Sequence, residues 1–131
     1  MPRSKLFRVP VGADRIAFSK GAIGAPRAGV GPLQVVYVGG FLPLHGVETI
    51  IDAAALVESR RGPEFARFTL VGDGMTAWHS DRDIAARGLR TVRRMPRLAY
   101  VDALDELARA DIALGVFGTT AKAGRVVPHK L

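Results

Sequence analysis

Glycines and a histidine follow the first long apolar run of the chain, in a pattern that suits phosphate binding. Gly39 and Gly40 lack side chains just before Gly46, where a helix is expected to begin, so backbone amides there could approach an anion closely. His45 could donate to a phosphate oxygen as a neutral imidazole, and we expect it to be a donor rather than a base. The alternatives are a plain glycine turn and an exposed histidine beside a helix start.

A second candidate is the triplet Gly72-Asp73-Gly74, which closes another apolar run. Two glycines around an acid suit a sharp turn in which a ligand ring or a backbone segment comes near. The alternative is a turn that binds nothing, with Asp73 capping the helix that follows.

The third candidate is a basic cluster near the end of the chain. Gly118 leaves the last apolar run and is followed by Lys122, Arg125 and Lys130. Arginine offers a two-pronged donor and lysine a point charge, so together they could neutralise a diphosphate. The alternative is a basic, frayed C-terminus.

The spacing of the remaining polar residues does not indicate a catalytic side chain. The sequence offers no defensible pair of carboxylates, no Ser-His-Asp set and no cluster of metal ligands, since its three histidines are far apart. We therefore predict no catalytic residue, no metal and no cofactor within this chain. Any chemistry would depend on the phosphates of the substrate or on residues outside the chain.

The elements that would position these residues alternate along the sequence. Apolar, β-branched runs predict strands, and apolar residues at helical spacing predict the helices between them, the last of which would be capped by Asp102. Such alternation predicts an α/β fold with a Rossmann-like, doubly wound, mostly parallel sheet, whose ligands bind at the carboxyl ends of the strands. The expected strands are 33–38, 66–71, 89–95 and 111–116, and the expected helices begin near residues 47, 78 and 102.

Length and composition indicate a single domain. The first 32 of the 131 residues read as a linker or entry segment rich in glycine and proline, and 33–131 as the domain. Cysteine is absent and no apolar stretch reaches membrane-spanning length, which favours a cytoplasmic location. The net charge of +7 favours anionic partners. We expect most of the excess to lie on solvated faces, in a set comprising Arg3, Lys5, Arg8, Arg60, Arg61, Arg90, Arg93, Arg94 and Arg97.

Several segments, in this order, resemble the C-terminal domain of group 1 glycosyltransferases, the retaining GT-B enzymes that move a sugar from a nucleotide donor. The turn after the first strand is similar to "V-G-R-L-…-K-G" of that family, and the second turn to "i-V-G-d-G". The matching segments are Phe7 to Asp14 with Phe18, Val38 to Gly46, Leu70 to Gly74, Ala110 to Ile112 and Phe117 to Lys130.

The resemblance implies that this chain binds the donor, a UDP- or GDP-sugar carrying a hexose-type sugar. The family's arginine and lysine of the first turn, which hold the diphosphate, are matched here by Gly40 and His45, so Lys122, Arg125 and Lys130 are expected to supply the charge. The family continues into a further helix, whereas this chain stops at Leu131. The resemblance thus predicts a truncated domain that does not transfer sugar alone, with an acceptor-binding domain elsewhere and membrane contact only through the parent enzyme.

Two other functions stay open at this point. One is a non-catalytic basic Rossmann-like module that binds a protein partner or nucleic acid, although the few aromatic residues are not interleaved with arginines as in single-strand binding platforms. The other is a chain that completes its sheet by self-association into a homo-oligomer, since an unfinished parallel sheet exposes apolar surface.

Overall fold

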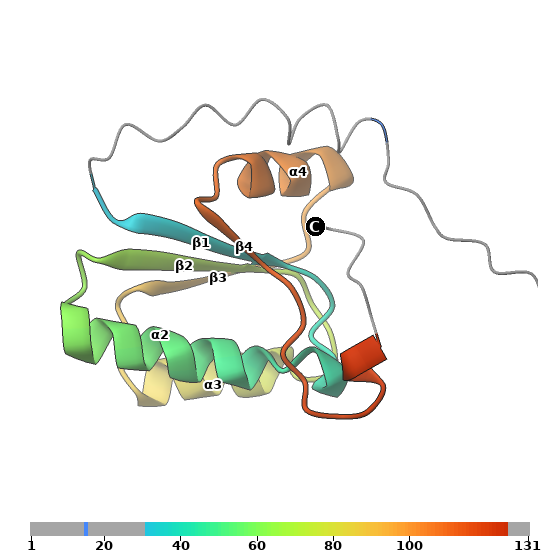
Figure 1. Cartoon of the computed structure of the whole chain (residues 1–131), viewed down its shortest axis with the longest axis horizontal. Coiled ribbons are helices and arrows are strands. Elements are labelled where there is room, and N and C mark those ends of the chain that lie inside the picture. The colour runs from blue at the N-terminus through green and yellow to red at the C-terminus, as the bar shows by residue number, and fades with distance from the viewer. Residues whose placement is uncertain (1–14, 16–30, 126–131) are drawn as a thin grey trace, which may run out of the picture.

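A computed structural model describes residues 31–125 together with the single residue Arg15. Its centre is one four-stranded sheet in the order β3-β2-β1-β4, and all three strand pairs are parallel (Figure 1). This confirms the predicted α/β, Rossmann-like class. The strands are β1 (Leu33–Val38), β2 (Ala66–Val71), β3 (Val92–Met95) and β4 (Ile112–Leu114).

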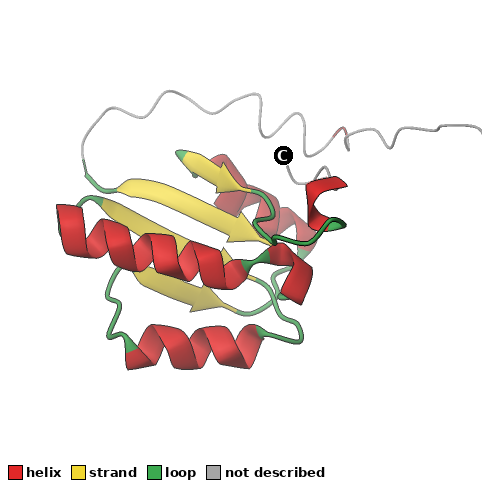
Figure 2. Ribbon diagram, turned by 60° about the horizontal axis from the view of Figure 1, so that its bottom comes forward, coloured by secondary structure: helices red, strands yellow, loops and turns green. Residues whose placement is uncertain are grey.

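Helices cover both faces of this sheet (Figures 1 and 2). Helices α2 (Val47–Arg61) and α3 (Ala77–Ala86) lie on one face, and α4 (Tyr100–Ala108) lies on the other. The chain builds outward from β1 through β2 to β3 and then crosses back to place β4 on the other side of β1. The order therefore reverses between β1 and β4, the topological switch point beside which α/β sheets bind ligands.

The core fills the layer between the sheet and α2. Tyr37 and Leu70 on the two central strands are fully buried, and Ile51 and Ala54 of α2 pack into the same cluster. Strands β1 and β2 are in register along their whole length, from Leu33 opposite Ala66 to Val38 opposite Val71. Because the paired strands end together, the turns that follow them start at the same edge of the sheet.

Three predicted element bounds differ from the structure. The prediction that Asp102 caps the last helix is wrong, because extended backbone at Ala99 starts α4 at Tyr100, and Asp102 lies within the first turn. Strand β3 begins at Val92 rather than residue 89, since the amides of Arg90 and Thr91 donate to the Glu58 carboxylate instead of joining the ladder. Strand β4 is also shorter than predicted.

No helix in the part of the chain that the structure describes is long and apolar enough to cross a membrane. The predicted boundary at Pro32 and the entry segment before it lie almost wholly outside the described residues. They remain predictions, as does the cytoplasmic location.

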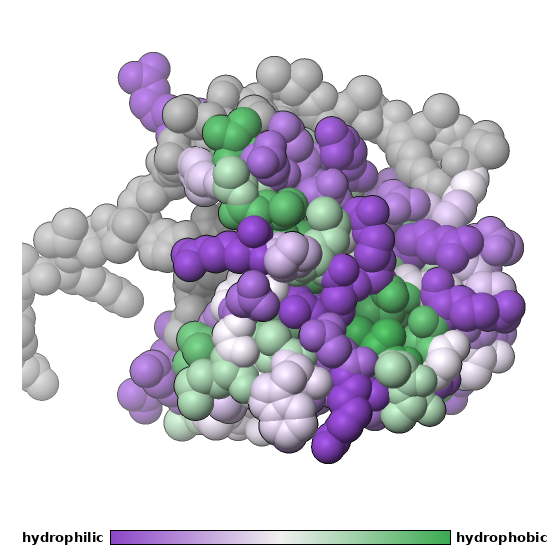
Figure 3. Space-filling view, turned by 180° about the vertical axis from the view of Figure 1, so that it is seen from behind, coloured by the Kyte–Doolittle hydropathy of each residue, from purple (hydrophilic) through white to green (hydrophobic). Residues whose placement is uncertain are grey.

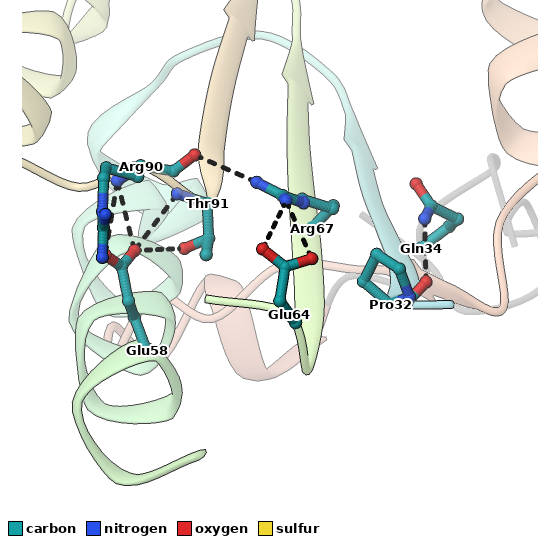
Figure 4. A network of polar contacts seen from close by, with 7 residues as sticks. All are labelled: Pro32, Gln34, Glu58, Glu64, Arg67, Arg90 and Thr91. Atoms are coloured by element: carbon teal, nitrogen blue, oxygen red, sulfur yellow. Dashed lines mark hydrogen bonds and ion pairs between the residues drawn. The ribbon is translucent and has the colours of Figure 1, made fainter. Parts of the chain in front are cut away.

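Glu58 fastens the end of α2 to the start of β3 (Figure 4). Its carboxylate accepts hydrogen bonds from the Thr91 hydroxyl at 2.6 Å, the Thr91 amide at 3.1 Å and the Arg90 amide at 3.2 Å. The Thr91 hydroxyl bond is the main cause that lowers the pKa of Glu58 below its ordinary value. Only 14% of this side chain is exposed, so these bonds are poorly replaced by water.

We expect Glu58→Gln to reduce the free energy of unfolding at neutral pH by about 1–2 kcal/mol, because charge-assisted hydrogen bonds to a mostly buried carboxylate are lost. A folded-state pKa below the unfolded one stabilises the protein above the unfolded pKa. This stabilisation disappears as the pH falls through the folded pKa. Urea unfolding at neutral and acid pH should show the difference between the two proteins shrinking in acid.

Glu64→Gln is the matched control for Glu58→Gln. Glu64 pairs with Arg67 at 3.3 Å (Figure 4), but its side chain is 79% exposed. Exposed ion pairs contribute little, so this variant should unfold within about 0.5 kcal/mol of the parent. An equal loss from both substitutions would contradict the role given to Glu58.

Candidate functional site

A cleft of about 410 Å³ opens at the carboxyl ends of β1 and β2, below the start of α4. Its floor is made by the ends of the two strands and the turns that leave them, and its wall by the segment between β3 and α4. The lining residues are Val38, Gly39, Gly40, Val71, Gly72, Asp73, Arg97, Leu98, Tyr100 and Ala103. Four residues predicted from the sequence, Gly39, Gly40, Gly72 and Asp73, are thus brought together at one place.

Backbone hydrogen bonds hold the two turns of the cleft against each other. The Gly39 amide donates to the Val71 carbonyl at 3.0 Å, and the Phe41 amide donates to the Asp73 carbonyl at 2.9 Å. Between them, the Gly40 amide has no backbone partner within residues 31–125. A free amide at the rim of a cleft is the kind of donor that can bind an anion.

The glycines of these turns differ in what they do. Gly72 has φ of 133°, and a Cβ atom there would overlap the Gly39 carbonyl oxygen; a Cβ atom on Gly74 would lie 2.7 Å from the backbone of Phe41. Both are therefore required by contacts within the chain itself. A Cβ atom on Gly40 would meet only ordinary contacts, the nearest being the Leu42 side chain at 3.6 Å.

Asp73 does not cap α3, which was one alternative for it. The residue before α3 is Thr76, and no side chain caps that helix. The Asp73 carboxylate instead lies 3.7 Å from the Arg94 guanidinium and 3.5 Å from the Arg97 amide. It is 61% exposed, so it remains accessible from the cleft.

His45 lies outside the cleft lining but is joined to it by one side chain. Its Nδ1 atom is 2.7 Å from the Tyr37 hydroxyl, which donates to the Gly40 carbonyl at 2.8 Å. His45 ends η2 (Pro43–His45), a single turn whose carboxyl end leads through Gly46 into α2. Its ring is thus fixed from the sheet side, directly before the first free amides of that helix.

The segment after β4 packs on the same turn. The Phe117 amide donates to the His45 carbonyl at 2.9 Å, and a Cβ atom on Gly118 would overlap the Leu44 carbonyl oxygen. Gly118 is therefore needed for this close approach of two backbones at the β1/β4 switch point. The contact places the beginning of the predicted basic cluster beside His45.

The rest of that cluster is only partly described. Lys122 and Arg125 are exposed, the latter in η3 (Ala123–Arg125), and neither lines the cleft. Lys130 lies outside the described residues. The structure therefore brings the first two candidate segments together. The described part of the basic cluster follows the segment that packs on Leu44 and His45, outside the cleft.

The sequence analysis missed the wall of the cleft. Arg97, Leu98 and Tyr100 come from the segment after β3, and Tyr100 is 53% exposed. The available signal was their position after the third strand, because carboxyl ends of parallel strands share one edge. Together they give the cleft an apolar wall with one cationic side chain beside the two polar turns.

Arg94 was expected on a solvated face, and this expectation is wrong. Its side chain is mostly buried and contacts several groups around the cleft. Its side chain is 14% exposed and donates to the Gly72 carbonyl at 2.7 Å and to Asp81 at 2.9 Å. The guanidinium also lies 4.1 Å from the centre of the Phe41 ring. Both turns of the cleft and α3 are thus tied to one cation.

Several other arginines form ion pairs with acidic side chains. Arg67, Arg87, Arg90, Arg93 and Arg109 each form an ion pair within the described residues. Hydrophilic side chains are spread over the face seen in Figure 3 rather than gathered on one element. The ion pairs do not favour the alternative of a basic surface for nucleic acid, because such a surface needs a concentrated patch of positive charge.

No protein-family model matches the sequence, and no curated protein matches it significantly. Solved structures do match. One is a crystal structure of a mutant of TarM from S. aureus, in complex with fondaparinux, α-GlcNAc-glycerol and UDP. The TM-score is 0.57 at 16% identity, over 64% of this chain and 16% of that chain. The likeness shows the α/β, Rossmann-like fold, and the matched part of this chain spans about a sixth of the length of that neighbour.

Proposed function

We propose that this chain is the donor-binding part of a glycosyltransferase and that the cleft between the β1 and β2 turns receives a nucleotide-sugar. The observation that carries the proposal is the cleft itself, which combines a Gly40 amide that has no backbone partner among the described residues with an exposed carboxylate on Asp73 and an apolar wall. Its volume of about 410 Å³ lies in the range of small-molecule sites.

The lining residues suggest how a nucleotide would lie. Leu98 and the Tyr100 ring offer apolar surface for a base, and the Asp73 carboxylate can accept hydrogen bonds from ribose hydroxyls. Phosphates would then extend along the β1 turn toward Gly40 and His45. The UDP of the neighbouring TarM complex makes uridine nucleotides the first choice of probe.

Cationic charge is the remaining requirement of such a site, because the leaving nucleotide diphosphate gains charge during transfer. Lys122 and Arg125 follow the segment that packs on His45 and are exposed. We propose that they and Lys130 approach the phosphates in the complete enzyme. A hexose-type sugar, retention of configuration and dependence on an acceptor-binding part elsewhere are further elements of this proposal.

Calorimetric titration of the chain with UDP, GDP and their sugars tests donor binding. We expect saturable, one-to-one binding of one nucleotide class, and Gly40→Ala should weaken it at least tenfold, since the added methyl group blocks close approach to the backbone. Gly88→Ala is the control, because Gly88 follows α3 and has no atom within 4 Å of an added Cβ. Absence of binding, or equal loss from both substitutions, would refute the proposed site.

A further inference from the structure

We propose that Tyr37 is a positioning residue that fixes the ring of His45, so that His45 takes up one proton when it binds the phosphates of a nucleotide. The inference rests on the proposed function and deepens it. It assigns the protonation state in which the histidine beside the cleft contacts its ligand.

Hydrogen-bond donors and acceptors around the Tyr37 hydroxyl determine the tautomer of His45. The hydroxyl has a single proton, and its oxygen lies 2.8 Å from the Gly40 carbonyl oxygen and 2.7 Å from His45 Nδ1. A carbonyl oxygen only accepts, so the proton is donated to Gly40. The hydroxyl oxygen then accepts from an N–H group on Nδ1, and in the neutral ring Nε2 keeps its lone pair.

Packing keeps this arrangement in place. Tyr37 is fully buried, and burial raises the pKa of its hydroxyl far above the ordinary value, so the proton stays on the oxygen. The Phe41 ring contacts the Tyr37 ring edge-on, with centroids 5.7 Å apart. The centroid of the His45 ring lies 6.4 Å from that of the Tyr37 ring. The hydroxyl therefore cannot turn away to release Nδ1.

A neutral His45 of this tautomer is a poor ligand for an anion, in contrast to the neutral donor expected from the sequence. The lone pair on Nε2 would face a phosphate oxygen, which also has only lone pairs, and the two would repel each other. One proton taken from solvent converts Nε2 into a donor and gives the ring a positive charge. Bound phosphates would favour that charge by direct attraction, so protonation and binding are coupled.

Other charged groups near His45 do not supply this coupling. The charged or titratable side chains on the described segments that adjoin His45 are Tyr37 of β1, Glu48 in the first turn of α2, and Lys122 and Arg125 after β4, while Asp52, Glu58, Arg60 and Arg61 lie on later turns of α2. Carboxylates, lysines and arginines ordinarily keep their charge between about pH 6 and pH 8, where histidine changes its own. A proton taken up on binding in this range is therefore expected at His45.

The test uses UDP-glucose, because its diphosphate is esterified at both ends and does not titrate in this range, whereas a terminal phosphate with a pKa near 6 does. Calorimetry in buffers of different ionisation enthalpy should show uptake of about one proton at about pH 8. The affinity should fall about tenfold between about pH 7 and pH 8. His79→Gln, an exposed histidine of α3, should leave both results unchanged.

Tyr37→Phe should flatten this pH profile. Without the hydroxyl, the neutral ring can carry its proton on Nε2 and donate to phosphate, so the affinity should change less than about twofold over the same interval. His45→Gln, which donates without titrating, should flatten it as well and serves if Tyr37→Phe does not fold. A retained slope in a folded Tyr37→Phe protein would overturn the role of Tyr37.

Nitrogen NMR of the histidine rings in the ligand-free protein provides a readout that does not require binding. At about pH 8 we expect the His45 proton on Nδ1, and a proton on Nε2 would overturn the inference whatever the nucleotides do. Binding that is independent of pH would refute proton uptake alone. A failure to bind at any pH, with the proton seen on Nδ1, would refute the proposed function and the phosphate contact built on it.

Discussion

Gly72→Ala is expected to destabilise the folded chain by more than about 3 kcal/mol, the largest effect predicted for a single methyl group in this protein. The backbone of Gly72 has φ of 133°, a region that side chains rarely adopt, and the added Cβ would overlap the Gly39 carbonyl oxygen. A flexible side chain could move aside, but Gly39 is main chain and its amide is already bonded to Val71. The β1 and β2 turns would have to separate.

Two other glycine substitutions separate the effect of backbone strain from that of steric overlap. Gly88 has φ of 59° with nothing within 4 Å of an added Cβ, so Gly88→Ala should cost about 1 kcal/mol from backbone strain alone. Gly40 has neither a positive φ nor an overlap, and Gly40→Ala should stay within about 0.5 kcal/mol of the parent. Urea unfolding followed by circular dichroism would measure all three.

A Gly72→Ala protein no less stable than Gly88→Ala would contradict the contact between the two turns. The comparison also separates folding from binding, since Gly40→Ala is predicted to weaken nucleotide binding while leaving stability nearly unchanged. The two glycines line the same cleft. Gly72 is needed to build it, and Gly40 is proposed to keep it open.

Sequence reasoning predicted the central strands correctly because their signals are local. The six-residue runs of β1 and β2 are mostly apolar and are followed by glycines, and both were predicted with the bounds that the structure shows. The outer strands were less accurate. The amides before β3 bond to Glu58 on α2, and a partner so distant in sequence leaves no trace in a local pattern.

The location of the candidate site could be predicted from the sequence, but the role of each residue in it could not. Parallel strands bring their ending turns together, so Gly39, Gly40, Gly72 and Asp73 were expected at one edge and lie there. A glycine required by a neighbouring backbone and one kept open for a ligand look identical in a sequence. Only the positions of the surrounding atoms assign Gly72 to the first role and leave Gly40 available for the second.

The burial of Arg94 is a second feature that the sequence does not reveal. In the sequence it is one of several arginines around a weak strand, and its neighbour Arg93 has the same residue type. Successive side chains of a strand point to opposite faces, so one guanidinium is buried against Phe41 while the other is 63% exposed. The pattern alone does not tell which of the two faces the turns.

Arg94→Ala should reduce the free energy of unfolding by about 2–4 kcal/mol, because it leaves polar groups that were bonded to a charge without a partner. The Gly72 carbonyl loses a donor at 2.7 Å and Asp81 loses one at 2.9 Å, at a side chain only 14% exposed. The Phe41 ring loses the cation above its face. Urea unfolding would measure the loss.

Arg93→Ala is the matched control, since the side chain of Arg93 forms one long ion pair within residues 31–125, with Glu106 at 3.8 Å, and the variant should unfold within about 0.5 kcal/mol of the parent. Arg94→Lys keeps the charge without the planar fork and should fall between the two. Because Arg94 holds the Gly72 carbonyl and the Phe41 ring together, Arg94→Lys should also weaken nucleotide binding under conditions where the protein stays folded. Equal stability of the two alanine variants would mean that the turns hold each other without Arg94, and the cleft would then depend on their backbone contacts alone.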